Sequence, residues 1–162
     1  MDILEYALKM EKDGEATYSE LAAKSDSKGL SAIFTMLADA EVKHYDTIKK
    51  MQQGETNSGL TEDPILDHAK NVFTIMKEQE GMFQFSMSQK EAYEKALDIE
   101  EKSHAFYLEK SEEAESEPQK QIFLQLAAEE KKHVVLMQNI IDFISRPEQW
   151  LEDAEWHHLD EY

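Results

Sequence analysis

Cysteine is absent from this chain of 162 residues, and glycine and proline are scarce, with five and three copies. Without cysteine the chain cannot form disulfide bonds, thiolate zinc sites, iron–sulfur clusters or a cysteine nucleophile. The low glycine and proline content argues against a turn-rich β protein and against a fibrous or disordered chain. Apolar residues make up 41% of the sequence, which together with the length predicts one domain with a well-buried core.

Basic residues are also few, with 17 lysines and arginines against 35 acidic residues, so the formal net charge is −18. This charge has the wrong sign for binding nucleic acid or an anionic membrane surface, and it attracts cations to any cleft where carboxylates converge. No apolar run approaches the ~18 residues that a membrane span needs. Asp2 and Glu5 place acid where a secretory signal carries base, so we expect a cytoplasmic protein.

Apolar residues recur at every third or fourth position in four long segments, which is the period of an amphipathic helix. The pattern predicts helices over residues 2–25, 30–51, 88–115 and 118–145. A shorter helix is expected from Pro64 to about Gln79, after a loop over residues 54–63, whereas residues 81–88 are ambiguous. The last segment, 147–162, is expected to be a short amphipathic segment that packs on the bundle or on a partner subunit.

The chain contains an internal repeat. Residues 7–50 align with residues 96–139 without a gap at a constant offset of 89, and 14 of the 44 aligned pairs are identical. Unrelated segments of average composition would share roughly three. The repeat predicts a duplicated helical hairpin joined by a crossover over residues 51–90. The expected fold is therefore an all-α four-helix bundle with one long crossover, over residues 1–146.

Two glutamates and one histidine recur in each repeat, although such residues are rarely buried without a partner. Each hairpin carries a Glu-x-x-His sequence on its second helix, and this spacing places both side chains on one helix face. The first helix of each hairpin adds one glutamate to the inward face. A pseudo-twofold axis would bring all six to the bundle centre, so the predicted metal ligands are Glu11, Glu41, His44, Glu100, Glu130 and His133.

Four carboxylates in an apolar core repel one another unless cations compensate them, and two divalent ions cancel the four charges. Imidazole ligands favour first-row metals of the iron or manganese type over calcium or magnesium, so we expect two ions of this type. Either Glu-x-x-His alone could be an ion pair or a satisfied core histidine. Tyr18 and Tyr107, seven residues after the first-helix glutamates, are core residues, hydrogen-bond donors to the site or radical relays.

Glutamate on the first helix, Glu-x-x-His on the second, and a second copy of both resemble the ferritin-like di-iron carboxylate superfamily, specifically the rubrerythrin group. The resemblance covers residues 1 to about 145, and the stretch from Ala7 to Tyr18 is similar to the first helix of stand-alone rubrerythrin-like proteins. The resemblance implies that Glu41 and Glu130 bridge or chelate the metals. It also implies that Glu11 and Glu100 are the glutamates of the helices that supply one ligand each, and that His44 and His133 are terminal nitrogen ligands. The metals that it implies are two iron ions, with manganese or a mixed pair as alternatives.

The chain departs from rubrerythrins proper in two ways. It has no cysteines for a rubredoxin domain, so the resemblance implies an external electron donor such as a rubredoxin-type protein. Ser103 and His104 stand after Glu100, where rubrerythrins place an additional glutamate. His104 and its repeat equivalent Glu15 are optional seventh ligands or face solvent.

Three functions are compatible with this sequence. The first is a non-haem di-iron oxidoreductase that reduces hydrogen peroxide or dioxygen in oxidative stress defence. The second is a ferritin-type iron oxidation, storage or handling protein. The third is a non-catalytic, metal-stapled interaction module that binds a partner through the segment with Trp150 and Trp156. In that segment, His157 and His158 are either a solvated surface pair or an adventitious metal site. We expect a homodimer or a larger homo-oligomer.

Overall fold

The computed structural model of the chain describes residues 1–55, 57, 59–78 and 87–145. These residues form five helices: α1 (Ile3–Lys24), α2 (Lys28–Gln52), α3 (Ile65–Glu78), α4 (Met87–Glu113) and α5 (Glu117–Ser145). The predictions for the segment 147–162, including Trp150, Trp156, His157 and His158, fall outside the described residues. None of the described helices is long and apolar enough to cross a membrane.

Short polar side chains set where the helices begin. Asp2 caps α1 by accepting the backbone N–H of Glu5 at 2.8 Å, and Ser27 caps α2 by accepting that of Leu30 at 3.2 Å. The Ser27 cap places the start of α2 at Lys28, two residues before the predicted start. Pro118 lies in the first turn of α5, where its missing N–H costs no hydrogen bond.

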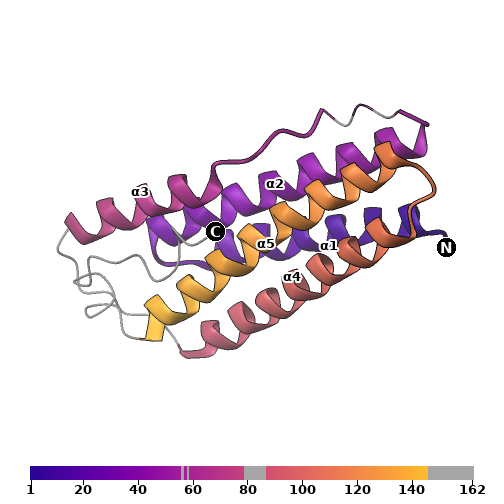
Figure 1. Cartoon of the computed structure of the whole chain (residues 1–162). Coiled ribbons are helices and arrows are strands. Elements are labelled where there is room, and N and C mark those ends of the chain that lie inside the picture. Colours follow the sequence, from indigo (N-terminus) through magenta and orange to yellow (C-terminus); the bar gives the residue numbers. More distant parts are fainter. Residues whose placement is uncertain (56, 58, 79–86, 146–162) are drawn as a thin grey trace.

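The two hairpins of the repeat form the bundle (Figure 1). α1 packs along α2 and α4 packs along α5, and these are the most extensive helix contacts of the described residues. The crossover between α2 and α4 contains α3, which packs on α2 and α5. The prediction of an all-α bundle built from a duplicated hairpin with a long crossover is therefore confirmed.

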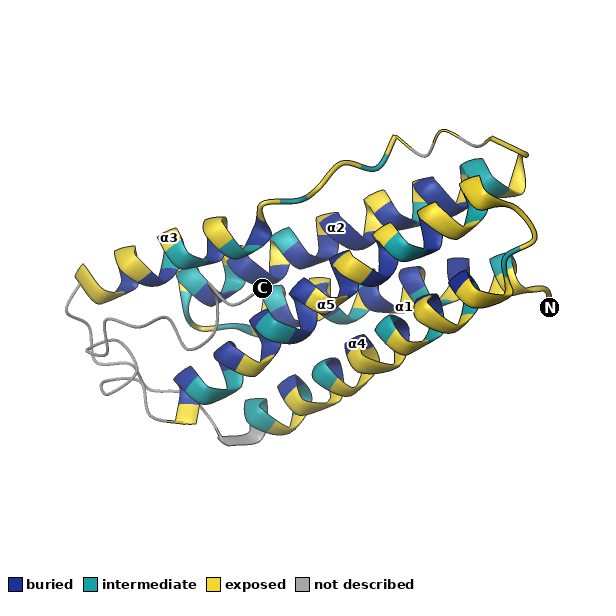
Figure 2. Ribbon diagram, in the orientation of Figure 1, coloured by how far each residue is buried: buried dark blue, intermediate teal, exposed yellow. Residues whose placement is uncertain are grey.

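Two apolar clusters fill the core, and a polar layer separates them. One cluster includes Phe34, Phe73 and Phe143, and the other includes Ile48 and Phe123. On every long helix, at least one buried glutamate lies between the residues of the two clusters. Figure 2 shows how the buried residues of the four long helices face the interior. The helical period thus carries one ring of polar side chains into the middle of an otherwise apolar core.

Candidate metal centre

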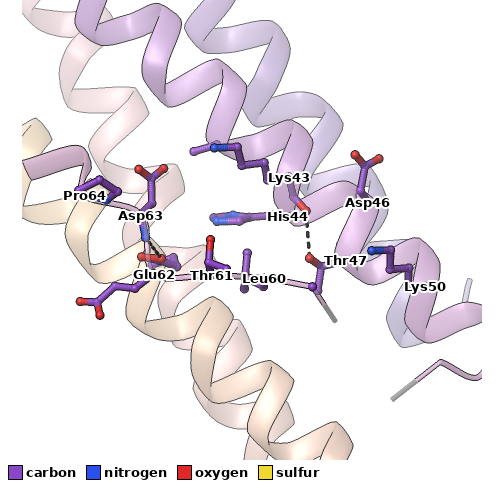
Figure 3. Close-up of a pocket in the computed structure, with 13 residues that line it drawn as sticks. Lys43, His44, Asp46, Thr47, Lys50, Leu60, Thr61, Glu62, Asp63 and Pro64 are labelled. Atoms are coloured by element: carbon purple, nitrogen blue, oxygen red, sulfur yellow. Dashed lines mark hydrogen bonds between the residues drawn. The ribbon is translucent and has the colours of Figure 1, made fainter. Parts of the chain in front are cut away.

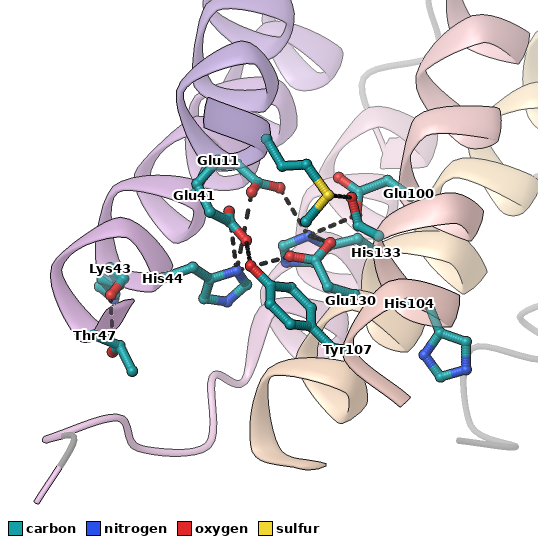
Figure 4. Close-up of polar contacts among 12 residues, drawn as sticks. Glu11, Glu41, Lys43, His44, Thr47, Glu100, His104, Tyr107, Glu130 and His133 are labelled. Atoms are coloured by element: carbon teal, nitrogen blue, oxygen red, sulfur yellow. Dashed lines mark hydrogen bonds and ion pairs between the residues drawn. The ribbon is translucent and has the colours of Figure 1, made fainter. Parts of the chain in front are cut away.

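The polar layer is formed by the six residues predicted as metal ligands, which come from all four long helices (Figure 4). α1 contributes one glutamate, α4 contributes another, and α2 and α5 each contribute one Glu-x-x-His pair. Each side chain is almost fully shielded from solvent, with 1–3% relative exposure: Glu11, Glu41, His44, Glu100, Glu130 and His133. Buried charged groups at this depth require compensation by partners or by cations.

The six side chains form two overlapping groups whose potential ligand atoms lie within 4.8 Å of one another. One group combines Glu11 and His44 with Glu41 and Glu130, and the other combines Glu100 and His133 with the same two glutamates. Glu41 and Glu130 belong to both groups. A carboxylate has two oxygens and can bind one metal through each, so these two glutamates are placed to bridge a pair of ions.

His44 presents its Nδ1 atom to three carboxylates. Nδ1 lies 2.9 Å from Glu130 Oε1, 3.4 Å from Glu11 Oε2 and 3.9 Å from Glu41 Oε2. These oxygens come from three different helices, so the imidazole faces a common space rather than a single partner. The arrangement matches a nitrogen ligand that completes a carboxylate site.

His133 repeats this arrangement in the other half of the bundle. Its Nδ1 atom lies 3.3 Å from Glu41 Oε1, 3.4 Å from Glu100 Oε2 and 3.8 Å from Glu130 Oε2. The two imidazole rings are nearly parallel, with an interplanar angle of 12° and ring centroids 5.6 Å apart. The sequence repeat therefore becomes a pseudo-symmetric site with one histidine for each group.

Several ligand atoms of the centre are buried without a hydrogen-bond partner among the described residues. They are Glu11 Oε2, Glu41 Oε1, Glu100 Oε2, Glu130 Oε2 and His133 Nδ1. A buried acceptor without a partner is costly, whereas a metal ion satisfies several such atoms at once. The available donor atoms are carboxylate oxygens and imidazole nitrogens, a combination that suits iron or manganese. The residues present therefore fit a pair of divalent ions.

Tyr18 and Tyr107 hold the two glutamates that belong to only one group. Tyr18 donates its hydroxyl to Glu100 Oε1 at 2.8 Å, and Tyr107 donates to Glu11 Oε1 at 2.6 Å. Each bond joins the two halves of the repeat and leaves Oε2 of the glutamate directed at a histidine. Burial raises the pKa of both tyrosines well above the usual value, and the neighbouring carboxylates raise it further, so both stay protonated donors.

Replacing either tyrosine by phenylalanine should destabilise the metal-free protein. The change leaves one buried carboxylate oxygen without its donor, which costs about 1–3 kcal/mol. Urea unfolding followed by circular dichroism measures the loss for Tyr18→Phe and Tyr107→Phe. Tyr6→Phe is the matched control because Tyr6 is 49% exposed. Equal stability of all three variants would show that the hydroxyls do not support the glutamates.

The four carboxyl groups fall into two electrostatic classes. Burial raises the pKa of Glu41 well above its ordinary value, and the charges on Glu11 and Glu130 add to this effect. The pKa of Glu130 is raised well above its ordinary value for the same reasons. Burial also raises the pKa of Glu11, but the charge on His44 and the hydrogen bonds to Glu11 together outweigh it, and the net pKa is lowered. For Glu100, burial is likewise outweighed by the charge on His133 together with the hydrogen bonds that Glu100 makes, and its pKa is lowered. Without cations, Glu41 and Glu130 therefore tend to bind protons, which removes the cost of burying their negative charges.

The optional ligands Glu15 and His104 lie outside both groups. His104 Nδ1 lies 2.8 Å from the backbone oxygen of Ala127, and Glu15 is 3.8 Å from Lys12 on the same helix. Gly14, one residue before Glu15, faces the site instead. A Cβ atom at this position would lie 3.2 Å from the carboxyl carbon of Glu41. The absence of a side chain at Gly14 therefore leaves room for the carboxylate of Glu41.

Sequence reasoning missed a buried ion pair next to the centre. Glu129 and Lys132 are only 4% and 5% exposed, and Lys132 Nζ lies 2.8 Å from Glu129 Oε2. Glu129 accepts the N–H of Asp63 at 2.7 Å, and Lys132 donates to the carbonyl of Asp63 at 3.0 Å. The pair thus holds the crossover on α5. The repeat contained a signal for it, because Glu129 aligns with Ala40 directly before the matched pair Glu41 and Glu130.

A family model described as Rubrerythrin matches residues 2–75 and 91–157. The chain belongs to the rubrerythrin family. The match covers both hairpins and therefore all six residues of the centre, and the gap in it falls within the crossover. It confirms the predicted membership of the ferritin-like di-iron proteins. No curated protein and no solved structure matches the chain. Within the rubrerythrins, this chain has no cysteine, so its own residues cannot form the four-cysteine iron site of a rubredoxin domain.

Proposed function

We propose that the chain is a non-haem di-iron oxidoreductase that reduces hydrogen peroxide or dioxygen with electrons from a separate donor. The observation that carries this proposal is the pair of overlapping ligand groups that share Glu41 and Glu130. A site with six protein ligands for two ions leaves coordination positions open for small molecules. Closed structural sites, by contrast, fill every position with protein ligands.

The six ligands would hold two iron ions, with the glutamates supplying negative charge and the histidines neutral nitrogen. When bound, the iron pair supplies two electrons to an oxidant and accepts them again from a donor. The protein residues keep this chemistry in place. Tyr18 and Tyr107 fix the orientation of Glu100 and Glu11, and the apolar clusters on both sides exclude water from the layer.

Reduction of one hydrogen peroxide to two waters consumes two electrons and two protons. The 162 residues contain no cysteine that could relay electrons, so the proposal includes an external donor of the rubredoxin type. The negative charge of the chain, −18, favours a donor that presents a positively charged face. The oxidants are small and uncharged, so this field does not repel them.

Peroxide consumption by the reduced, iron-loaded protein tests the proposal. We expect Glu41→Gln with Glu130→Gln to lower the rate by at least about 100-fold, because first-shell ligands matter more than the outer partners whose loss costs 10–100-fold. Glu91→Gln with Glu94→Gln is the matched control, since it removes the same charge from two exposed positions on α4. Equal rates for both double variants would contradict the proposal. Ferrous iron uptake that continues well beyond two ions per chain would instead favour a storage protein.

A further inference from the structure

A cavity of about 350 Å³ reaches the metal centre from the side of the crossover (Figure 3). One wall is formed by α2 between Ala40 and Lys50, and the opposite wall is the extended chain from Gly59 to Pro64. His44 lines the cavity and, through Nδ1, also belongs to the centre. The cavity therefore ends at a residue of the ligand set. Two further hollows, near Gln125 and near Asp26, are lined by none of the six ligands.

The centre needs such a route because its ligands are deeply buried. None of the six residues is more than 3% exposed, so a cation cannot bind from bulk solvent without passing through the protein. At ~30 Å³ per water molecule, the cavity holds a divalent ion together with its first shell of water. The ion can lose this water gradually as protein ligands replace it.

The cavity wall carries charges that suit a cation. Four carboxylates line it, against the two ammonium groups of Lys43 and Lys50; the four belong to Asp46, Glu62, Asp63 and Glu129. Lys132, from outside the cavity, pairs with Glu129 at 2.8 Å and also lies 3.6 Å from Glu62. Asp46 and Glu62 are exposed at the mouth of the cavity. The net formal charge of the wall is negative, in line with the charge of the whole chain. A cleft of this kind concentrates cations.

The cavity lies at one of the positions where the two halves of the repeat differ. Ala40 and Glu129 are equivalent in the repeat, and both line the cavity. On α5, Glu129 accepts the N–H of Asp63 and so holds the crossover in place as the outer wall. On α2, the small side chain of Ala40 leaves the space beneath it open. The asymmetry thus produces a fixed outer wall and a space behind it.

We propose that this cavity is the entry site through which divalent metal ions reach the centre, with His44 as the first ligand that they meet. The inference rests on the metal binding of the proposed function, but it does not depend on any reaction with peroxide. Asp46 and Glu62 attract the hydrated ion to the mouth. The Glu129–Lys132 pair keeps the crossover at the distance that the ion needs.

Filling the cavity should slow metal uptake without changing the amount bound. Thr61→Trp, at an exposed position of the outer wall, and Ala40→Leu, at the inner wall, both narrow the route. The probe is Co²⁺, whose absorbance reports binding by stopped flow, and elemental analysis gives the final stoichiometry. We expect slower uptake by both variants with the stoichiometry of the wild type. Thr74→Trp, at an exposed threonine of α3 away from the cavity, should bind at the wild-type rate.

The charge argument has its own test. Asp46→Asn with Glu62→Gln should slow uptake at low salt by at least about threefold, and added salt should reduce the difference. Glu91→Gln with Glu94→Gln removes the same net charge far from the cavity mouth and should have little effect. Wild-type uptake rates in both Thr61→Trp and Ala40→Leu, with full stoichiometry, would overturn the entry site and leave the metal centre intact. A wild-type protein that binds no stoichiometric Co²⁺, Fe²⁺ or Mn²⁺ would overturn the entry site and the proposed function together.

Discussion

Replacing Glu41 and Glu130 by glutamine is expected to abolish metal binding and, at the same time, to stabilise the metal-free protein. Metal binding is lost because both ligand groups use these two carboxylates. An amide has no negative charge and only one oxygen, so it cannot bridge two cations. We expect about two metal ions per chain in the wild type and less than about 0.2 in the double variant, since charge and ligand count set the affinity of such a site.

In the absence of metal, the same double variant is expected to be more stable than the wild type. Burial and neighbouring negative charges raise the pKa of Glu41 and Glu130, which means that their charged forms destabilise the fold. Glutamine has the same shape without the charge. Replacing buried charged groups by neutral groups of similar volume often stabilises a protein by about 1–4 kcal/mol.

Two measurements check this prediction. Elemental analysis of protein purified without oxygen gives the metal content, and urea unfolding in the presence of a chelator gives the free energy of unfolding. The double variant Glu91→Gln with Glu94→Gln, at exposed positions of α4, should resemble the wild type in both. A Glu41 and Glu130 variant that retains two metal ions, or one that unfolds more easily than the metal-free wild type, would show that the bridging positions are assigned wrongly.

The second large effect is the pH dependence of stability, which should have opposite signs with and without metal. The pKa values of Glu41 and Glu130 are raised above 4.5 in the folded state. Their contribution to stability is fully present below pH 4.5 and is lost as the pH rises through their folded values. Burial lowers the pKa of His44, but the charge and hydrogen bond of Glu11 and the charges of the other nearby glutamates together outweigh it. The net pKa is therefore above 6.5, and this contribution is also lost as the pH rises.

The carboxyl groups of Glu11 and Glu100 affect the stability of the metal-free protein at lower pH. Glu11 and Glu100 have pKa values below 4.5, so their contribution is present above pH 4.5 and is lost as the pH falls below it. Between pH 4.5 and neutral pH, the groups with raised pKa values therefore determine whether stability rises or falls with pH. We expect the metal-free protein to be more stable at about pH 5.5 than at about pH 7.5.

The metal-loaded protein should show the reverse, because protons compete with metal for the same carboxylates and acidification releases the ions. Urea unfolding at the two pH values, with metal and with a chelator, measures both slopes. The Glu41→Gln, Glu130→Gln variant is the control, since it lacks the two groups and should lose most of the pH dependence. Metal-free protein that becomes less stable between pH 7.5 and 5.5 would contradict the charge distribution derived for the centre.

The sequence predicted most of the helices to within two residues at each end. The α5 helix ends at Ser145 as expected, whereas α2 begins at Lys28 rather than Leu30 because Ser27 caps it. Helical periodicity and caps are local properties, so they can be read from neighbouring residues. The repeat also related residues that are far apart along the chain, because its offset of 89 aligns Glu11 with Glu100.

The sequence alone also identified the six residues of the candidate centre. Glutamate and histidine are uncommon on inward helix faces, and here the same three positions carry them in both halves of the repeat. Only the tertiary structure decided how they combine. Tyr18 reaches Glu100 and Tyr107 reaches Glu11 across the two halves, and Glu41 and Glu130 are shared by both groups. These relations depend on how the two hairpins dock, which intervals along one helix do not specify.

The cavity beside His44 lies at the limit of what the sequence can reveal. The mismatch of Ala40 and Glu129 is visible in the repeat. Its structural consequence depends on the hydrogen bond from Asp63 to Glu129, which forms only when the crossover packs against α2 and α5. The sequence thus determined the helices, the repeat and the metal-binding residue types, because each follows from the spacing of residues within a helix. The shared ligands, the tyrosine bonds and the route to the centre were decided by tertiary packing, since each joins atoms from segments that are far apart along the chain.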